Sequence, residues 1–149
     1  MPRVFSGPVE ISEKPTAGLG KTFIGTSLRL TFQCTAVTAD VNKAEFPTLR
    51  FQTARVQTFQ EWQQHEVRVN GVLVGTIDKQ QEDPAGGFLF EFPFQQRVLK
   101  VDTTPNPWEC PLASVNVLEV ALGSGGFGLE DSFDIDWIEA QGFTTTLDA

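Results

Sequence analysis

The sequence contains no tyrosine, one histidine, one methionine and two cysteines among 149 residues. Two cysteines and one histidine do not provide a zinc site of recognisable spacing. No stretch approaches the roughly 18 apolar residues of a membrane-spanning helix. Clusters of lysine and arginine are also missing, and the net charge is −8. A surface of this sign repels phosphate groups, so we expect neither nucleic acid binding nor insertion into a membrane.

The first residues, Met1 to Pro8, lack the apolar run of a secretory signal. The sequence therefore favours either a protein that works inside a cell or particle, or one whose signal has been cut away. The length favours a single domain spanning residues 1–149, because a chain of this size buries roughly 70% of the surface that it exposes when unfolded. Thirteen phenylalanines supply material for a core, so folding requires neither metal nor disulfide.

Cys34 and Cys110 could form a disulfide bridge or remain free thiols. A bridge would close a long loop and add about 4 kcal/mol in the chain-entropy model. Cys34, however, continues the alternation of Leu28, Leu30 and Phe32, which points its side chain toward the core. Burial is common for unpaired cysteine, so we favour two free thiols and keep the bridge as the alternative.

A period of two dominates the apolar pattern. Phe88, Phe90, Phe92 and Phe94 fall on one face of an extended segment, and residues 28–33 and 133–138 alternate in a similar way. Residues 115–122 form a nearly continuous apolar strand that Asn116 and Glu119 interrupt. Such alternation is typical of strands with one face in the core. Trp137 alternates with Phe133 and Ile135, so we expect it in the core. Strands are expected near residues 3–12, 21–34, 48–57, 66–69, 72–75, 88–94, 97–102, 115–122 and 133–141.

The clearest local signal is the dipeptide Asn70-Gly71, which favours a type I′ hairpin turn. In that hairpin Val69 would face Val72 and Val67 would face Val74, with all four valines on one face. A proline cannot donate a hydrogen bond to a neighbouring strand, so the strand that contains Pro93 should be at a sheet edge or bulged.

Helix signals are scarce. Thr58 and Glu61 have the spacing of a capping box, but the segment 58–64 is short enough that we expect only one or two turns. Many short strands separated by glycine- and proline-rich turns favour an all-β sandwich or barrel.

Patterns associated with catalysis have simpler structural explanations. Gly123 to Gly128 match the spacing G-x-G-x-x-G, but a strand-like stretch follows where a dinucleotide site needs a helix. His65 has no nucleophile-elbow sequence beside it, and we expect a structural or surface histidine. A glycosidase needs two carboxylates across a cleft, and spacing selects no pair among nineteen acidic residues. We therefore expect no enzymatic activity.

Two groups of residues are candidates for ligand binding. Trp62 and Trp108 lie in expected loops, where an exposed indole can stack on a sugar ring. The alternative is that each covers an open end of the core. The acidic run Glu130, Asp131, Asp134 and Asp136 could bind a hard cation such as calcium, or could simply form the solvated face of a strand.

Three stretches, residues 67–75, 115–120 and 133–138, resemble the galactose-binding-like jelly rolls, to which many carbohydrate-binding modules belong. In that family an Asn-Gly hairpin, an Asn-x-Leu-x-Val strand and a final Asp-Trp-Ile strand recur in this order. The resemblance implies an antiparallel two-sheet jelly-roll sandwich of about eight to ten strands with little helix.

The same resemblance implies a structural calcium ion, held by acidic residues near the start of the chain and on the last strand. By position these are Glu10 and Asp136. Sugar contacts in the family come from loop aromatics, which here would be Trp62 and Trp108. We therefore predict a non-catalytic binding module with carbohydrate as its ligand. The alternative is a structural subunit that contacts protein partners in a virion, a phage tail or another particle.

Overall fold

A computed structural model of the chain describes residues 3–12, 22–57, 65–77, 87–101, 115–123 and 132–145. These ranges contain ten β-strands, two short 3₁₀ turns and no α-helix. Within them, no helix has the length and hydrophobicity needed to cross a membrane. The strands are β1 (Arg3–Ser12), β2 (Thr22–Gly25), β3 (Ser27–Val37), β4 (Thr48–Gln57), β5 (His65–Val69), β6 (Val72–Ile77), β7 (Gly87–Pro93), β8 (Val115–Ala121), β9 (Ser132–Gln141) and β10 (Phe143–Thr145). The turns are η1 (Val41–Lys43) and η2 (Gln96–Val98). The helix expected within 58–64 lies outside the described residues.

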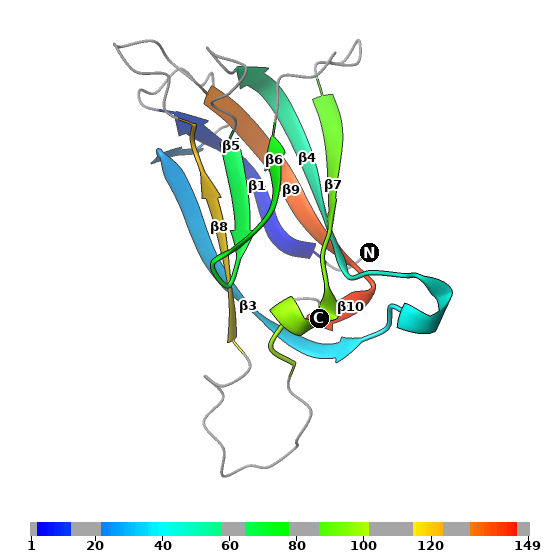
Figure 1. Ribbon diagram of the computed structural model, residues 1–149. Helices are drawn as coiled ribbons and strands as arrows, with labels where there is room; N and C mark the ends of the chain where they lie inside the picture. Colours follow the sequence, from blue (N-terminus) through cyan, green and yellow to red (C-terminus); the bar gives the residue numbers. More distant parts are fainter. Residues whose placement is uncertain are drawn as a thin grey trace.

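The strands pair into two five-stranded sheets that pack face to face (Figure 1). One sheet has the order β2-β1-β9-β4-β7, and the other has the order β10-β3-β8-β5-β6. Pairings between these strands are antiparallel, except that β1 and β2 are parallel. The predicted all-β, antiparallel two-sheet jelly-roll sandwich is therefore confirmed, with β2 as an exception.

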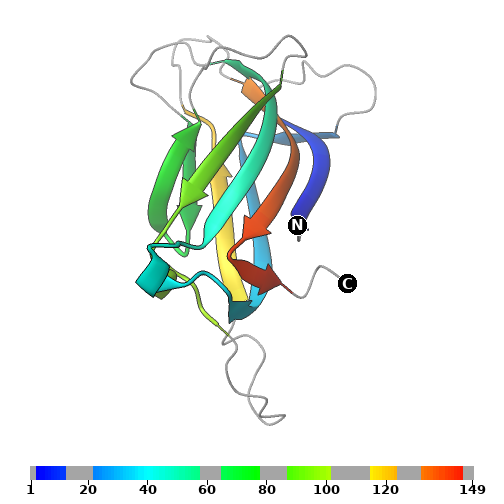
Figure 2. The same cartoon turned by 90° about the vertical axis from the view of Figure 1, so that its right-hand side faces the viewer.

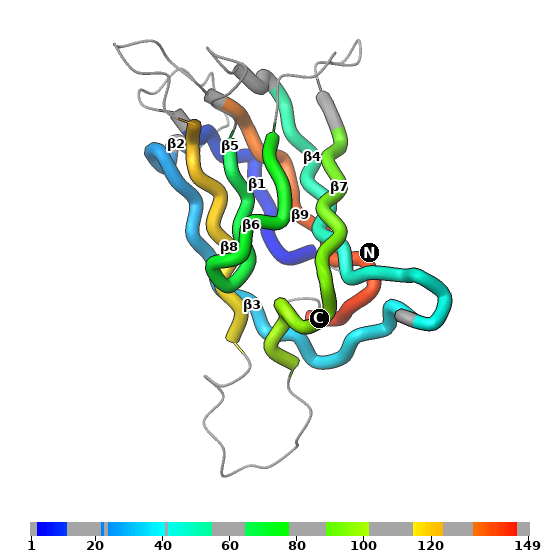
Figure 3. The backbone as a smooth tube through the Cα atoms, viewed as in Figure 1, coloured from blue at the N-terminus to red at the C-terminus, as the bar shows by residue number. Residues whose placement is uncertain are grey.

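One end of the sandwich, which we call the His65 end, carries three connections between the sheets. At this end Gln57 of β4 pairs with Ser132 of β9, and His65 of β5 contacts Gly123 after β8. The strands β4, β6 and β8 finish here, and β5, β7 and β9 begin here (Figure 3). In each of the successive pairs β4–β5, β6–β7 and β8–β9 the two strands belong to different sheets, so the chain passes from one sheet to the other three times between strand ends at this end.

The opposite end, the Asn70 end, carries the turn of the β5–β6 hairpin. Asn70 and Gly71 have φ angles of 51° and 81°, which agrees with the predicted type I′ turn. The first and last described residues, Arg3 of β1 and Thr145 of β10, lie toward this end of the sandwich (Figure 1).

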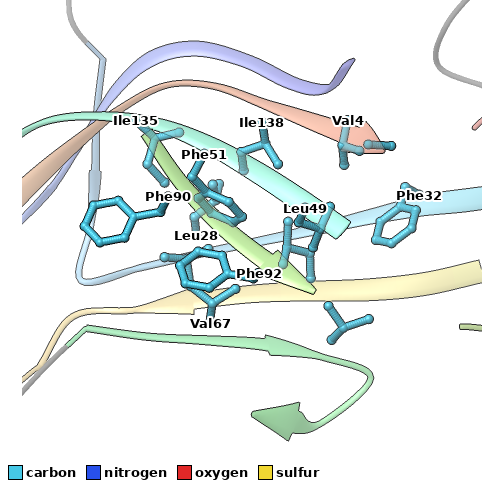
Figure 4. Packing of buried hydrophobic residues seen from close by; sticks show 14 of the residues in the cluster. Val4, Leu28, Phe32, Leu49, Phe51, Val67, Phe90, Phe92, Ile135 and Ile138 are labelled. Carbon is cyan, nitrogen blue, oxygen red and sulfur yellow. The ribbon is translucent and has the colours of Figure 1, made fainter. Parts of the chain in front are cut away.

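Inward-facing side chains of both sheets form one hydrophobic core (Figure 4). Phe90, Phe92 and Phe94 are buried, so the predicted phenylalanine stripe faces the core over these positions. Leu28 and Phe32 of β3 are buried on the facing sheet, as their alternation predicted. Burial of such side chains removes apolar surface from water, which is the main favourable contribution to folding.

The prediction that Trp137 is a core residue is wrong. Ile135 and Ile138 of β9 both point into the core, although they are three positions apart (Figure 4). Strict alternation would put them on opposite faces, so a bulge at 136–137 must shift the phase of the strand. Trp137 is consequently half-buried on the outer face of its sheet, where it pairs with Gln52 of β4.

The β5–β6 hairpin forms as predicted, but its register changes after the turn. Val69 pairs with Val72, and a shift then places Val67 opposite Gly75 instead of Val74. Val67 and Val69 are fully buried, whereas Val72 is 47% exposed at the sheet edge. The predicted pairing of Val69 with Val72 is therefore confirmed, and the predicted pairing of Val67 with Val74 is wrong.

A glycine interrupts one predicted strand, and a proline is the last residue of another. The strand predicted over residues 21–34 separates at Gly25, whose φ of +99° is a conformation that favours glycine, into β2 and β3 of different sheets. Pro93 is the last residue of β7, which is an edge strand as predicted.

The prediction of a strand over residues 97–102 is also wrong for the described residues 97–101. This stretch contains η2 and a single bridge from Val101 to Cys34. The backbone N–H and C=O of Lys100 both bond to the side chain of Asn116, at 2.7 and 2.9 Å. A side-chain amide therefore takes the place that a neighbouring strand would occupy.

Cys34 is a free, fully buried thiol, as predicted, and Cys110 lies outside the described residues. The Sγ of Cys34 lies 3.5 Å from the carbonyl oxygen of Ala36. Burial raises the pKa of the Cys34 thiol, and this outweighs the smaller lowering effect of the Ala36 hydrogen bond. Because the folded pKa is raised, the thiol contributes stability that is present below the pKa of the unfolded thiol and is lost as pH rises through the folded pKa.

We therefore expect the free energy of unfolding to decrease more steeply above about pH 9 in the native protein than in Cys34→Ala, by about 1.4 kcal/mol per pH unit. Urea denaturation at a series of pH values measures this difference, with Cys110→Ser as the background of both proteins. Parallel curves for the two proteins would show that the thiol ionises equally easily in the folded and unfolded states.

Candidate functional site

Trp62 and Trp108, the predicted ligand-binding tryptophans, lie outside the described residues, but the strands that flank them are described. Trp62 belongs to the segment between β4 and β5, whose flanking residues are both at the His65 end. Trp108 belongs to the segment between η2 and β8, whose flanking residues are both at the Asn70 end. The fold therefore attaches the two tryptophans to opposite ends of the sandwich.

His65 is fully buried at the start of β5. Its Nδ1 accepts a hydrogen bond from the N–H of Gly123 at 3.0 Å, and its ring lies 4.4 Å from that of Phe133, centroid to centroid. A ring nitrogen that accepts a hydrogen bond carries no proton, so the proton of the neutral ring is on Nε2. His65 therefore links β5 to the residue after β8 and to β9. Of the two roles expected for it, structural or surface, the structural one is confirmed.

Glu10 of β1 and Asp134 of β9 are paired across adjacent strands, and both are buried. Carboxylate oxygens are among the ligands that hard cations such as calcium take. Asp136, the acid that the family resemblance associates with Glu10, lies two residues further along β9 and is half-buried. The described residues contain no group of three or more acidic, histidine or cysteine side chains that could hold a metal. The chemistry of the pair fits part of a calcium site, which takes roughly six to eight oxygen ligands.

The Asn70 end contains a buried amide network. The Oδ1 of Asn116 accepts hydrogen bonds from Asn70 Nδ2 at 2.9 Å and from the backbone N–H of Lys100, while its Nδ2 donates to the Lys100 carbonyl. Asn70 also donates to the carbonyl of Val98 and accepts from the N–H of Val117. The network holds together the two sides of the segment 102–114, because Lys100 lies two residues before it and Asn116 two residues after it.

Strands β7, β4, β9 and β1 lie side by side in one sheet (Figure 2). A row of alternating charges crosses the outer face of these four strands. The paired residues of this charged row are Glu91, Arg50, Glu139 and Arg3, in strand order. The Nε of Arg50 lies 3.3 Å from Glu91, and its Nη1 lies 4.0 Å from Glu139. The row contains two positive and two negative side chains, so its charges balance.

Trp137 lies beside the charged row on the same outer face. Its cross-strand partners are Gln52 on β4 and Ser6 on β1. The guanidinium carbon of Arg3 lies 5.9 Å from the centroid of the Trp137 ring, within the range of a cation–π contact. The outer face therefore combines an aromatic ring with neutral polar groups on both neighbouring strands.

Sequence reasoning missed three features of these sites. Asp134 was one member of an acidic run, and only the β1–β9 register identifies it as the partner of Glu10. Asn116 interrupted an apolar strand, and this buried polar position was a usable signal. Trp137 gave no signal, because the bulge that turns it outward leaves no mark in the alternation of residue types.

The sequence matches neither a known family profile nor a curated protein. In structure, the chain is similar to a family 35 carbohydrate-binding module from an environmental isolate. The two share 15% identity with a TM-score of 0.46, over 95% of this chain and 88% of that one. The architecture described above rests on the strand pairings of the chain itself.

Proposed function

We propose that this chain is a non-catalytic carbohydrate-binding module. The observation that carries the proposal is the gathering of three inter-sheet connections at the His65 end, one of which contains Trp62. Connecting segments held by a rigid scaffold are where binding residues concentrate. An indole supplies a flat apolar face for the C–H groups of a sugar ring, and its N–H can bond a hydroxyl.

The polar groups that the structure describes support binding without catalysis. His65, whose Nδ1 bonds to the backbone N–H of Gly123, serves a structural role inside the core. Glu10 and Asp134 are paired and buried, whereas a glycosidase needs its two carboxylates on either side of a cleft that admits substrate.

Affinity electrophoresis tests the proposal directly. The purified chain is run through native gels that contain soluble xylan, galactomannan, arabinogalactan or β-glucan, with bovine serum albumin as a non-binding control. We expect at least one polysaccharide to retard the chain, and calorimetry with its oligosaccharides should then give a saturable isotherm. Unchanged mobility in all four gels, together with no signal on a glycan array, would contradict carbohydrate binding.

We further propose that a calcium ion binds beside Glu10 and Asp134. The paired, buried carboxylates support this, because carboxylate oxygens are ligands that calcium prefers. Replacing EDTA with calcium at about one hundred times its dissociation constant should stabilise the fold by about 2.7 kcal/mol. Thermal unfolding in the two buffers measures this shift.

The response to calcium should disappear in Glu10→Gln and in Asp134→Asn, and it should survive in Glu119→Gln, which alters an exposed carboxylate. Asp136→Asn tests the acid that the family resemblance indicates. An identical melting temperature in EDTA and in millimolar calcium would rule out a stabilising ion at this pair.

The second candidate function is that of a structural subunit in a larger assembly. Strand β6 is a sheet edge without charged residues, and Val72 and Leu73 on it are 47% and 48% exposed. Edge strands of this kind can pair with strands of other chains. Light scattering after size-exclusion chromatography decides the matter for self-assembly: a subunit should form oligomers as its concentration increases, and a binding module should stay monomeric.

A further inference from the structure

We propose that the outer sheet face around Trp137 binds the ring of a neutral pyranose sugar. This inference rests on the carbohydrate-binding function proposed above, and it assigns the contact to a strand residue instead of the two loop tryptophans.

The first argument is the shape and charge of the contact surface. Trp137 is half-buried on β9, a central strand of its sheet, so its backbone is held by pairing with β1 on one side and β4 on the other. The face of an indole carries negative potential, which attracts the slightly positive C–H groups on one face of a pyranose. A ring fixed on paired strands loses little conformational entropy on binding, and this favours affinity.

The second argument is the polar chemistry beside the ring. Gln52 and Ser6 are the cross-strand partners of Trp137, and neighbouring strands are about 4.8 Å apart. A glutamine amide and a serine hydroxyl each donate and accept hydrogen bonds, as a sugar hydroxyl also does. Both residues face outward, because Gln52 lies between the buried Phe51 and Thr53 and Ser6 is exposed. Hydroxyl groups at the rim of a stacked sugar would meet them.

The third argument concerns charge and selects a neutral ligand. In the charged row beside Trp137, Arg50 lies within 4.0 Å of both Glu91 and Glu139. Arg3 is paired in register with Glu139 and contacts the Trp137 ring. Since each guanidinium group already has a carboxylate or an aromatic ring near it, an acidic sugar would gain little attraction here and would meet two carboxylates.

Nuclear magnetic resonance of ¹⁵N-labelled protein tests the inference, because each tryptophan gives one indole N–H signal. The variants Trp62→Phe, Trp108→Phe and Trp137→Phe assign the three signals. The probes are neutral oligosaccharides of xylan, galactomannan and β-glucan, with oligogalacturonate as the acidic comparison. We expect a neutral probe to shift the Trp137 signal in a saturable way, with little change at the other two.

Calorimetry with the same probe gives the matching loss of affinity. Trp137→Ala should weaken binding about tenfold or more, since it removes the main apolar contact. Gln52→Ala should weaken binding less, and Phe46→Ala, which alters an exposed aromatic outside this face, should leave binding unchanged. Circular dichroism checks that each variant is folded. If Trp137→Ala does not fold, the indole signals and Gln52→Ala still decide the question.

The outcomes separate this inference from the proposed function. A shift at Trp62 or Trp108 with an unmoved Trp137 signal would overturn the sheet-face site and leave carbohydrate binding in place. A Trp137 shift caused only by oligogalacturonate would overturn the choice of a neutral sugar. If no probe moves any indole signal and no polysaccharide retards the chain, the function itself fails, and the site fails with it.

Discussion

Gly75→Ala is expected to destabilise the sandwich by about 1–3 kcal/mol, the usual cost of overfilling a packed core. A Cβ atom at position 75 would lie 2.2 Å from Cδ1 and 2.6 Å from Cε1 of Phe92, which reaches across from the other sheet. The ring of Phe92 is buried and meets that of Phe51 edge to face, with centroids 5.3 Å apart. It therefore has little room to move away from the added methyl group.

Urea denaturation measures the loss, and thermal unfolding should show a fall in melting temperature of roughly 3–10 °C. The double variant Gly75→Ala/Phe92→Leu provides a stricter test, because leucine lacks the ring edge that the methyl group would strike. It should be more stable than the sum of the single changes predicts, by about 1 kcal/mol. Thr76→Ala, the next residue on β6, is the control and should change stability by about 0.5 kcal/mol. Additive single effects would show that the two positions do not contact one another.

The second large effect is expected at Asn116. Asn116→Ala removes hydrogen bonds to Asn70 and to both backbone groups of Lys100 in a buried site. Each buried polar group left without a partner costs about 1–3 kcal/mol, so we expect a total loss of about 3 kcal/mol. Gln96→Ala, an exposed change at the same end of the sandwich, is the control. Equal stability of the two variants in urea would contradict a structural role for the network.

Asn116→Asp separates lost hydrogen bonding from lost volume. The new carboxylate keeps an acceptor for the N–H of Lys100, but it faces the carbonyl oxygen of Lys100 without a proton to donate. Burial and the opposing carbonyl oxygen of Lys100 disfavour the charged form and raise the pKa of this carboxyl above its unfolded value of about 3.9, so the variant should recover stability relative to the native protein as pH falls toward 4. Gln96→Glu, an exposed carboxyl, should show no such recovery.

Alternation of residue types predicted most of the fold, because each strand with one buried face repeats every two residues. The stripes on β3 and β7 were identified for this reason, and Asn70-Gly71 located the hairpin. The method failed where the period itself changes. Bulges in β6 and β9 alter which residues face inward, and a single sequence does not show where an extra residue enters a pairing.

The candidate sites were harder to predict, since they depend on register between strands that are distant in the sequence. Glu10 and Asp134 are 124 positions apart, and Gln52 and Trp137 are 85 positions apart, yet each pair is directly opposite. Residue spacing along the chain contains no information about such pairings. The isolated polar residue Asn116 was visible in the sequence, but its partners Asn70 and Lys100 were not.

The positions of the two described chain ends have a practical consequence for all binding measurements. Arg3 and Thr145 both lie toward the Asn70 end, away from the His65 end and its three crossings between sheets. A biotin tag or fusion partner on either terminus would therefore anchor the molecule to a sensor surface by its Asn70 end. Immobilised in this way, the chain would present the His65 end to the solution, whereas coupling through surface lysines would orient it at random.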